Sequence, residues 1–284
     1  MLELETPAAM REWADRTRAA GRRIGLVPTM GYLHDGHLSL VAEARRRADA
    51  CVASIFVNPL QFGAGEDLSK YPRNVDCDRA ALEGAGVEAL YLPTTEAVYP
   101  AGFQTEVTVT KVSAGLCGRS RPGHFRGVTT VVTKLFNAVR PHVAVFGEKD
   151  FQQLAVIRRM TADLDLGVEI IGMPIVREAD GVAMSSRNAY LSAPERTAAR
   201  CLSRALAAGR AAFRSGARPA DAVLERVRAV LAAEPLARVD YAELVDAESI
   251  EPVATIERPA LLALAVYIGR TRLIDNTVLA ATSM

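Results

Sequence analysis

The sequence predicts an α/β fold in which a domain built on a parallel sheet precedes a smaller α+β domain. Up to about residue 175, short apolar runs alternate with segments of helical periodicity. Such alternation favours a parallel sheet covered by helices on both faces. After that point two Ala- and Arg-rich helical segments are followed by alternating strands. The 284 residues, half of them apolar, suffice for one large domain or two modest ones.

The first domain is assigned to residues 1–175, and its order of elements is Rossmann-like. Its strands are expected in short apolar runs at Ile24–Val27, Cys51–Val57, Ala89–Leu92, Val143–Phe146 and Val168–Val176. The helices between them are expected at His37–Ala48, Val75–Ala85, Gly127–Val139 and Phe151–Leu164.

The second domain, residues 176–284, is expected to be a small α+β unit that acts as a lid. Its helices are predicted at Pro194–Ser215 and Ala220–Ala233, and its strands at Val239–Val245 and Leu261–Ile268. The sequence contains no internal repeat and no low-complexity linker between the two domains.

Composition argues against nucleic acid or a membrane as the main partner. Lys and Arg number 34 against 33 Asp and Glu, a formal charge of +1. The longest apolar run, Ala260–Ile268, is far below the ~20 residues of a membrane helix. The acidic Met1–Glu5 start lacks the pattern of a signal peptide. The four cysteines show no Cys-x-x-Cys pair, so we expect free thiols and a cytoplasmic protein.

The segment Pro28–His37 is the first candidate for chemistry, because it leads from a predicted strand into a predicted helix. Ligands of open parallel sheets bind beyond the carboxyl ends of strands, and a helix start presents free N–H groups to phosphate. Gly31 and Gly36 allow close approach of the backbone, and His34 and His37 can donate hydrogen bonds to phosphate oxygens. The alternative is a tight turn with two solvated histidines, and the position of the pair favours phosphate binding.

Phe146–Gln153 also leads from a strand into a helix. Lys149, one of only four lysines in this Arg-rich chain, could reach a phosphate as a point charge. Asp150 could instead serve as a helix cap, and Glu148 could lie on a solvated face.

Met184–Asn188 offers two hydroxyls and a guanidinium in succession, which suits a mobile phosphate clamp. Taken alone, these residues favour the other interpretation, an ordinary turn rich in Ser and Asn.

Together these segments resemble the nucleotidyl transferase superfamily marked by a His-x-Gly-His turn. Within it, six motifs in sequence order resemble the pantothenate synthetase family along nearly the whole chain. The motifs are Pro28–Gly31, Phe56–Phe62, Tyr71–Arg73, Gly123–Gly127, Gly147–Asp150 and Met184–Asn188.

The resemblance implies a ligase that condenses (R)-pantoate with β-alanine, using ATP and Mg²⁺, through a pantoyl adenylate. AMP, pyrophosphate and pantothenate are the products, and the enzyme is expected to be a homodimer. His37 is implied as proton donor, with His34, Lys149 and Arg187 as further catalytic residues, and Gln61 and Gln153 are implied to hold pantoate. The implied ATP-binding residues are Met30, Gly31, Tyr32, Leu33, His34, Asp35, Gly36, His37, Gly147, Glu148, Lys149, Asp150, Val176, Met184, Ser185, Ser186 and Arg187.

One position departs from the family pattern. The helix after Tyr71–Arg73 usually carries adjacent acidic residues, and here Cys77 replaces the neighbour of Asp78. Mg²⁺ often uses one or two carboxylates together with phosphates and waters. Asp78 alone is therefore expected to be the protein's magnesium ligand.

Two other functions remain open on the residues. Another adenylyl transferase of the same superfamily would have no reason for Gln61 within Phe56–Phe62. A nucleotide-binding module without catalysis would not need both the His pair and Lys149.

Overall fold

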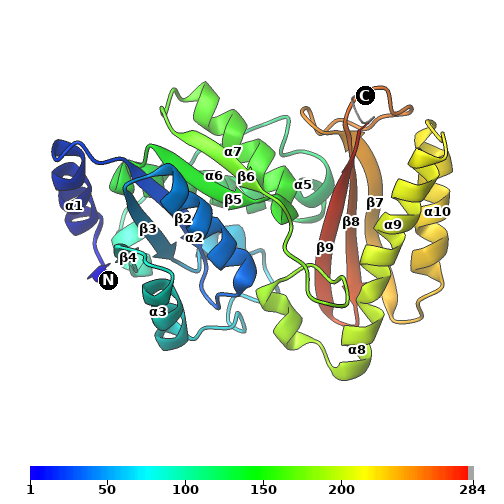
Figure 1. Ribbon diagram of the computed structural model, residues 1–284, viewed down its shortest axis with the longest axis horizontal. Coiled ribbons are helices and arrows are strands. Elements are labelled where there is room, and N and C mark those ends of the chain that lie inside the picture. The colour runs from blue at the N-terminus through cyan, green and yellow to red at the C-terminus, as the bar shows by residue number, and fades with distance from the viewer. Residues whose placement is uncertain (281–284) are drawn as a thin grey trace. The chain divides into compact units, whose positions relative to one another are not determined.

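The computed structural model describes residues 1–280, and the chain separates into two compact units (Figure 1). Unit 1 comprises Met1–Thr110, Arg121–Glu148 and Gln153–Ile175. Unit 2 comprises Lys111–Ser120, Lys149–Gln152 and the chain from Val176 onward. Two short segments from within residues 1–175 therefore pack with the C-terminal part.

Unit 1 is built on a parallel sheet whose strand order is β1-β4-β3-β2-β5-β6. The strands are β1 (Leu2–Leu4), β2 (Ile24–Thr29), β3 (Ala50–Ile55), β4 (Ala89–Tyr91), β5 (Val143–Gly147) and β6 (Glu169–Met173). Every residue of β3 is buried, as expected for a strand covered on both faces.

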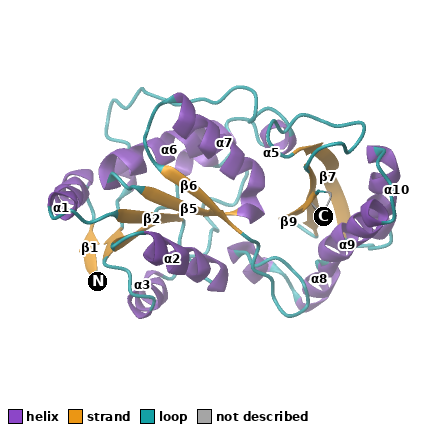
Figure 2. Cartoon of the chain, turned by 45° about the horizontal axis from the view of Figure 1, so that its top comes forward, coloured by secondary structure: helices purple, strands orange, loops and turns teal. Residues whose placement is uncertain are grey.

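Helices cover both faces of this sheet (Figure 2). One core joins the sheet to α1 (Pro7–Ala19), α6 (His124–Val139) and α7 (Phe151–Asp163). A second core, on the opposite face, joins it to α2 (Asp35–Arg47) and α3 (Val75–Gly84). The short helix α4 (Thr95–Val98) follows β4.

The strand order reverses between β2 and β5. From the central β2 the chain builds outward through β3 and β4, and it then returns to place β5 on the other side of β2. Ligands of open α/β sheets bind at such a switch point, beyond the carboxyl ends of the strands. Residues that follow β2 and β5 are therefore well placed for a site.

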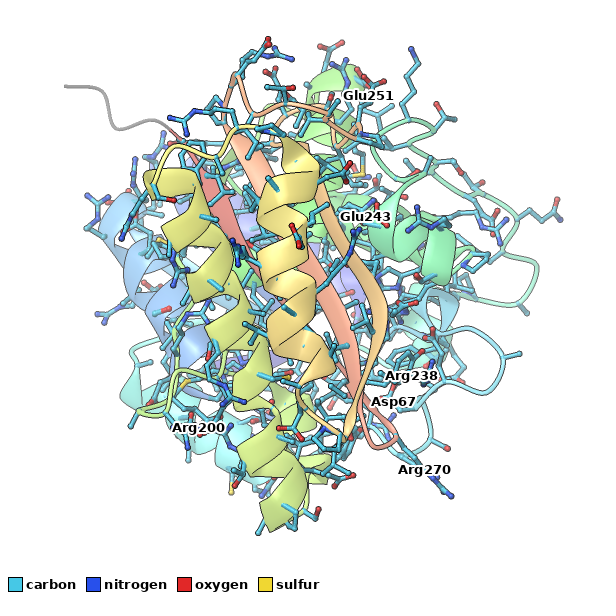
Figure 3. The ribbon with its side chains drawn as sticks, turned by 90° about the vertical axis from the view of Figure 1, so that its right-hand side faces the viewer. Asp67, Arg200, Arg238, Glu243, Glu251 and Arg270 are labelled. Carbon is cyan, nitrogen blue, oxygen red and sulfur yellow. The ribbon has the colours of Figure 1, made fainter. Side chains whose placement is uncertain are left out.

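Unit 2 contains the antiparallel sheet β7-β8-β9, formed by Ala237–Asp246, Ala260–Ile268 and Thr271–Leu279. Helices α9 (Arg200–Arg214) and α10 (Ala220–Ala232) run side by side over one face of this sheet (Figure 3). Helix α8 (Ala193–Ala198) precedes them. A core that includes Leu206, Val227 and Leu262 joins the two layers.

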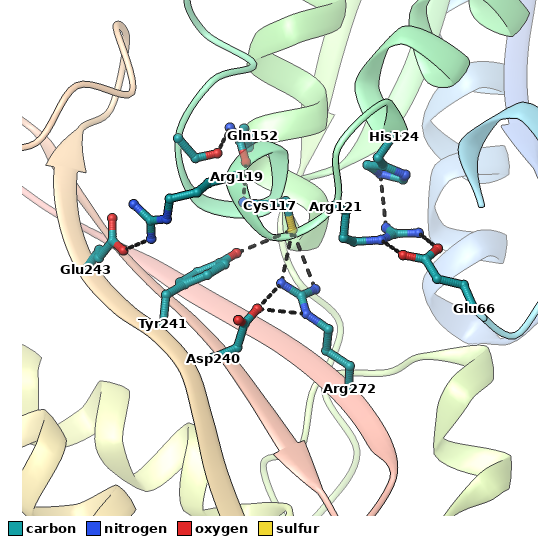
Figure 4. A network of polar contacts seen from close by, with 11 residues as sticks. Glu66, Cys117, Arg119, Arg121, His124, Gln152, Asp240, Tyr241, Glu243 and Arg272 are labelled. Carbon is teal, nitrogen blue, oxygen red and sulfur yellow. Dashed lines mark hydrogen bonds and ion pairs between the residues drawn. The ribbon is translucent and has the colours of Figure 1, made fainter. Parts of the chain in front are cut away.

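A polar network attaches the early segments to the sheet of unit 2 (Figure 4). Cys117 lies in α5 (Leu116–Ser120), and its backbone N–H donates to Gln152 Oε1 at 3.0 Å. Arg272 of β9 contacts Cys117 Sγ at 3.6 Å and pairs with Asp240 of β7 at 2.8 Å. These contacts explain why Lys111–Ser120 and Lys149–Gln152 belong to this unit.

The predicted α/β fold is confirmed, and several elements differ from their predicted form. The expected helix over 194–215 is interrupted at Ala199, where the Leu202 N–H donates to the Ala199 carbonyl in a tighter turn. The structure also has three elements that the sequence analysis did not predict, namely β1, α1 and β9. The run Ala260–Ile268 is the buried central strand β8, and no helix within residues 1–280 is long and apolar enough to cross a membrane.

The four cysteines are free thiols, as predicted. Burial raises the pKa of Cys51 to about 12 and that of Cys201 to about 11, so both thiols stay protonated at neutral pH. Cys77 is exposed.

Among the glycines of unit 1, Gly127 lies closest to the backbone of a neighbouring segment. A Cβ added there would lie 2.3 Å from the Leu60 carbonyl oxygen and 2.6 Å from the Gln61 nitrogen. We expect Gly127→Ala to lower the free energy of unfolding by about 1–3 kcal/mol, as overpacked substitutions do. Denaturant unfolding measures this change.

Gly84→Ala is the matched control, because a Cβ at this helical glycine would meet no atom within 4 Å. Alanine there should be neutral or stabilise by up to ~1 kcal/mol. Equal stability losses in the two variants would contradict the packing described for Gly127.

Candidate active site

The turn after β2 has an unusual backbone. Gly31 and Tyr32 both have positive φ, at 83° and 54°. A left-handed conformation costs a non-glycine residue about 1–2 kcal/mol, so Tyr32 needs support from its surroundings. The Gly31 N–H donates to Thr29 Oγ1 at 3.2 Å, and that hydroxyl donates to the Ser54 carbonyl at 2.8 Å.

Asp78 provides the main support for this turn. Its Oδ2 accepts from the Tyr32 N–H at 2.8 Å, and its Oδ1 accepts from the Leu33 N–H at 2.7 Å. The residue is only 3 % exposed. Asp78 reaches the turn from the first turn of α3.

The two histidines lie at the start of α2. His34 is the N-cap residue and His37 lies in the first turn, with ring centroids 4.1 Å apart. The His34 backbone N–H donates to His37 Nδ1 at 3.4 Å. Because Nδ1 accepts this bond, the neutral His37 ring carries its proton on Nε2. Asp35 and Gly36 complete the first turn of the helix.

Gln61 is brought next to Met30, so two of the predicted ligand-binding segments meet within unit 1. Gln61 ends the short 3₁₀ helix η1 (Pro59–Gln61) and is 9 % exposed. Its Nε2 lies 3.1 Å from Met30 Sδ, and its Oε1 accepts from Asn58 Nδ2 at 3.1 Å. Asn58 also donates to the Gly127 carbonyl at 3.0 Å, so the Gln61 side chain is oriented by a buried amide.

The backbone of Gln61 is held by a second set of contacts. Its carbonyl accepts from Arg121 at 3.2 Å and lies 2.8 Å from His124 Nδ1. Arg121 also pairs with Glu66 at 2.6 Å (Figure 4). Burial raises the pKa of Glu66, but the hydrogen bonds and charge of Arg121, together with a backbone hydrogen bond from Gly63 and the charge of His124, leave that pKa below its usual value.

Gly147 and Glu148 occupy the other side of the switch point in unit 1. Gly147 is the last residue of β5, the strand beside β2, and a Cβ there would meet no atom within 4 Å. Gln153 lies in the first part of α7 and is partly buried. Its neighbour Gln152 points to structural partners instead, donating to the carbonyls of Val112 and Gly115.

Lys149 and Asp150 belong to unit 2 and form the 3₁₀ turn η2 with Glu148. The Lys149 side chain is 20 % exposed, and Nζ lies 3.5 Å from Asp150 Oδ2. Asn276 Nδ2, from the buried strand β9, donates to the Lys149 carbonyl at 2.9 Å. The backbone at Lys149 is therefore fixed to the sheet of unit 2.

Val176 and the segment Met184–Arg187 come together in unit 2. The Met184 N–H donates to the Val176 carbonyl at 3.0 Å, and Arg177 pairs with Ala183 as an antiparallel bridge. Asp275 of β9, 3 % exposed, accepts two bonds from the Arg177 guanidinium at 2.7 and 2.8 Å.

Ser186 and Arg187 open the 3₁₀ helix η3 (Ser186–Tyr190), and the Ser185 hydroxyl caps it by accepting from the Arg187 N–H at 3.3 Å. Asn188 holds this end of the segment by donating to Glu178 Oε1 at 2.7 Å. The predicted phosphate clamp is thus an ordered turn attached to β9.

The described residues offer no preformed magnesium centre. Among residues 1–280 no group of three or more His, Cys, Asp or Glu side chains could hold a metal ion. Both oxygens of Asp78 already accept backbone hydrogen bonds, and Asp76 is an exposed partner of Arg79. This environment does not suit Asp78 as a metal ligand, and its magnesium role stays a prediction.

Sequence reasoning missed the residues that hold the predicted site residues in place. Asn58 had a detectable signal, because Asn before Pro is typical of a turn start. Asn276 had none, since its partner Lys149 lies 127 positions earlier. Its role depends on tertiary contacts.

Comparison with known proteins identifies the family of this chain. The family described as pantoate-beta-alanine ligase matches residues 3–278. Pantothenate synthetase of Geobacter sulfurreducens is 56 % identical over 276 residues, covering 97 % of this chain and 98 % of the relative. The Myxococcus xanthus protein of the same name is also 56 % identical, over 96 % and 94 % of the two chains.

Solved structures agree as well. Pantothenate synthetase from Thermus thermophilus superposes with a TM-score of 0.93 at 47 % identity, covering 98 % of this chain and 99 % of that one. Pantoate-beta-alanine ligase from Francisella tularensis, crystallised with beta-gamma ATP and beta-alanine, gives 0.79 at 29 % identity over 98 % and 97 %. The resemblance read from the six motifs is confirmed, and the chain belongs to the pantoate–β-alanine ligase family.

Proposed function

We propose that this chain is an ATP-dependent ligase that joins (R)-pantoate to β-alanine through a pantoyl adenylate, releasing AMP and pyrophosphate. The proposal rests on family membership over nearly the whole chain. A turn with two histidines at the switch point of the sheet supports it. The Francisella relative was crystallised with an ATP compound and β-alanine, which supports both as ligands here.

In the first step the pantoate carboxylate attacks the α-phosphorus of ATP, and pyrophosphate leaves. Residues 30–37 bind the nucleotide with the backbone N–H groups of the turn and of the helix start. His37, with its proton on Nε2, donates a hydrogen bond to phosphate as negative charge grows, and His34 lies beside it. Gly147 and Glu148 border the nucleotide from the end of β5.

Residues of unit 2 supply the remaining positive charge and hydroxyl donors. Lys149, Ser185, Ser186 and Arg187 act on the β- and γ-phosphates, which become pyrophosphate, while Asp150, Val176 and Met184 complete the nucleotide site. The Lys149 carbonyl is held by Asn276 of β9, and Arg177, which precedes the Met184–Arg187 segment, pairs with Asp275 of the same strand.

Pantoate is held by the amides of Gln61 and Gln153, which can donate to and accept from its hydroxyl groups. Asn58 Nδ2 donates to Gln61 Oε1, and this bond fixes the orientation of the Gln61 amide. In the second step the amine of β-alanine attacks the activated carbonyl of the adenylate and expels AMP. No covalent intermediate with the protein is required, because positioning and electrostatics lower both barriers.

Magnesium enters this proposal as part of the substrate, bound chiefly by the phosphates of ATP. We also propose a homodimer in the cytoplasm, as the family resemblance implies, with neither nucleic acid nor a membrane as partner. Four free thiols suit a reducing compartment.

The proposed order of chemistry predicts isotope exchange. Labelled pyrophosphate should enter ATP when pantoate is present and β-alanine is absent, because the adenylate forms reversibly in the first step. The measurement is label in ATP with and without pantoate. Absence of exchange at saturating pantoate and MgATP would argue for a concerted or phosphoryl route.

Lys149 is expected to act mainly in the transition state of adenylate formation. Loss of a charged donor of this kind removes about 2.7–4 kcal/mol of transition-state stabilisation, so Lys149→Ala should slow adenylate formation roughly a hundredfold or more. Lys149→Arg should also be impaired, because a planar guanidinium does not replace a compact ammonium. Single-turnover rates measure both effects.

Lys111→Ala is the control, since Lys111 is exposed in unit 2 and has no role in the proposed mechanism. Binding of preformed pantoyl adenylate should change little in the Lys149 variants, because pyrophosphate is absent from it. A folded Lys149→Ala protein with a near wild-type rate would remove Lys149 from the mechanism.

A further inference from the structure

Asp78 uses both carboxylate oxygens to hold consecutive backbone N–H groups. The contacts with Tyr32 at 2.8 Å and Leu33 at 2.7 Å have the lengths of charge-assisted hydrogen bonds. Asp78 lies 45 and 46 positions away from its partners in the sequence. The bonds therefore tie α3 to the turn between β2 and α2.

The backbone of this turn presents successive N–H groups to one negative charge. Gly31 and Tyr32 both have positive φ, and the N–H groups of Tyr32 and Leu33 both donate to the Asp78 carboxylate. A Cβ on Gly31 would lie 3.0 Å from Asp78 Oδ2 and 3.1 Å from Ile55 Cγ2. The absence of a side chain at Gly31 thus lets the Asp78 carboxylate approach closely. The carboxylate then accepts hydrogen bonds from the N–H groups of Tyr32 and Leu33.

The charge of Asp78 is balanced without a cationic partner. Within residues 1–280 no Lys or Arg side chain pairs with it, and the residue is 3 % exposed. Its place in the first turn of α3 adds the favourable field of a helix N-terminus. Mg²⁺ binds a carboxylate oxygen at a distance of about 2.0–2.1 Å and usually keeps several of its waters. The buried Asp78 carboxylate offers a hydrated ion little access.

We infer that Asp78 is a positioning residue that fixes the nucleotide-binding turn, and that it does not coordinate magnesium. This inference rests on the proposed binding of ATP by residues 30–37. The carboxylate acts through Tyr32 and Leu33, the two residues that precede His34. Replacing it should release the turn and displace the histidine pair that follows.

Asp78→Asn and Asp78→Glu together separate positioning from metal binding. The amide of Asn can accept one N–H but opposes the other with its own NH₂ group. Glu keeps a carboxylate that a metal could use, but its extra methylene moves the oxygens away from the turn. We expect both variants to lose about tenfold or more in ATP affinity, as removal of charged hydrogen bonds does.

The measurement is calorimetric titration with ATP, once in EDTA and once in saturating MgCl₂, after thermal melting has verified the fold. A positioning role predicts the same fold loss of affinity in both conditions. It also predicts that the magnesium concentration for half-maximal rate stays unchanged. Asp76→Asn is the matched control on the same helix, because that side chain is 94 % exposed, and it should behave as wild type.

A metal role gives the opposite result, with normal ATP affinity in EDTA for Asp78→Asn, a raised magnesium requirement, and recovery in Asp78→Glu. Any of these would overturn the inference. His37→Ala tests the underlying ATP site separately. If His37→Ala binds ATP normally while Asp78→Asn does not, the proposed role of His37 fails and the positioning role of Asp78 stands. If both variants bind ATP normally, both proposed roles fail.

Discussion

A buried carboxylate that satisfies two backbone N–H groups sets the conformation of the chain where β2 ends. Without Asp78, the N–H groups of Tyr32 and Leu33 would lack their acceptors, and a buried unsatisfied donor costs about 1–3 kcal/mol. Tyr32 also adopts a left-handed φ of 54° that a non-glycine residue avoids on its own. The start of α2, with both histidines, follows directly from this turn.

The same principle recurs at two other candidate residues, Gln61 and Lys149, which are held by partners outside the proposed site. Asn58 orients the Gln61 side chain, and Arg121 holds its carbonyl. In unit 2, Asn276 holds the carbonyl of Lys149. Electrostatic catalysis depends on donors that are already in place when charge develops, and these contacts supply that preorganisation.

The main sheet was predictable because it follows a local rule, the alternation of apolar runs with helical periodicity. The glycines and histidines of the turn after β2 are likewise a local signal, and the phosphate site predicted from them stays a prediction. Helix α1 also begins with a local signal that could have predicted it. Thr6 is the N-cap residue, its hydroxyl accepts from the Ala9 N–H, and Pro7 follows at the first helical position.

Elements shaped by tertiary contacts could not be predicted. Strand β9 carries Asp275 and Asn276 at buried positions, and polar residues there hide the strand pattern. They are buried because they bind Arg177 and the Lys149 carbonyl, partners that lie far away in the sequence. The backbone contacts of Asp78 could not be predicted for the same reason, since its partners are 45 and 46 positions distant.

The contacts of Asp78 imply that the turn after β2 is fixed before any ligand arrives. Amide hydrogen exchange of the ligand-free protein tests it most directly, because Tyr32 is 36 % exposed and yet its N–H donates to Asp78 Oδ2 at 2.8 Å. The account predicts slow exchange at Tyr32 and Leu33, comparable to the interior of α2. Exchange as fast as at the exposed Gly65 would contradict it.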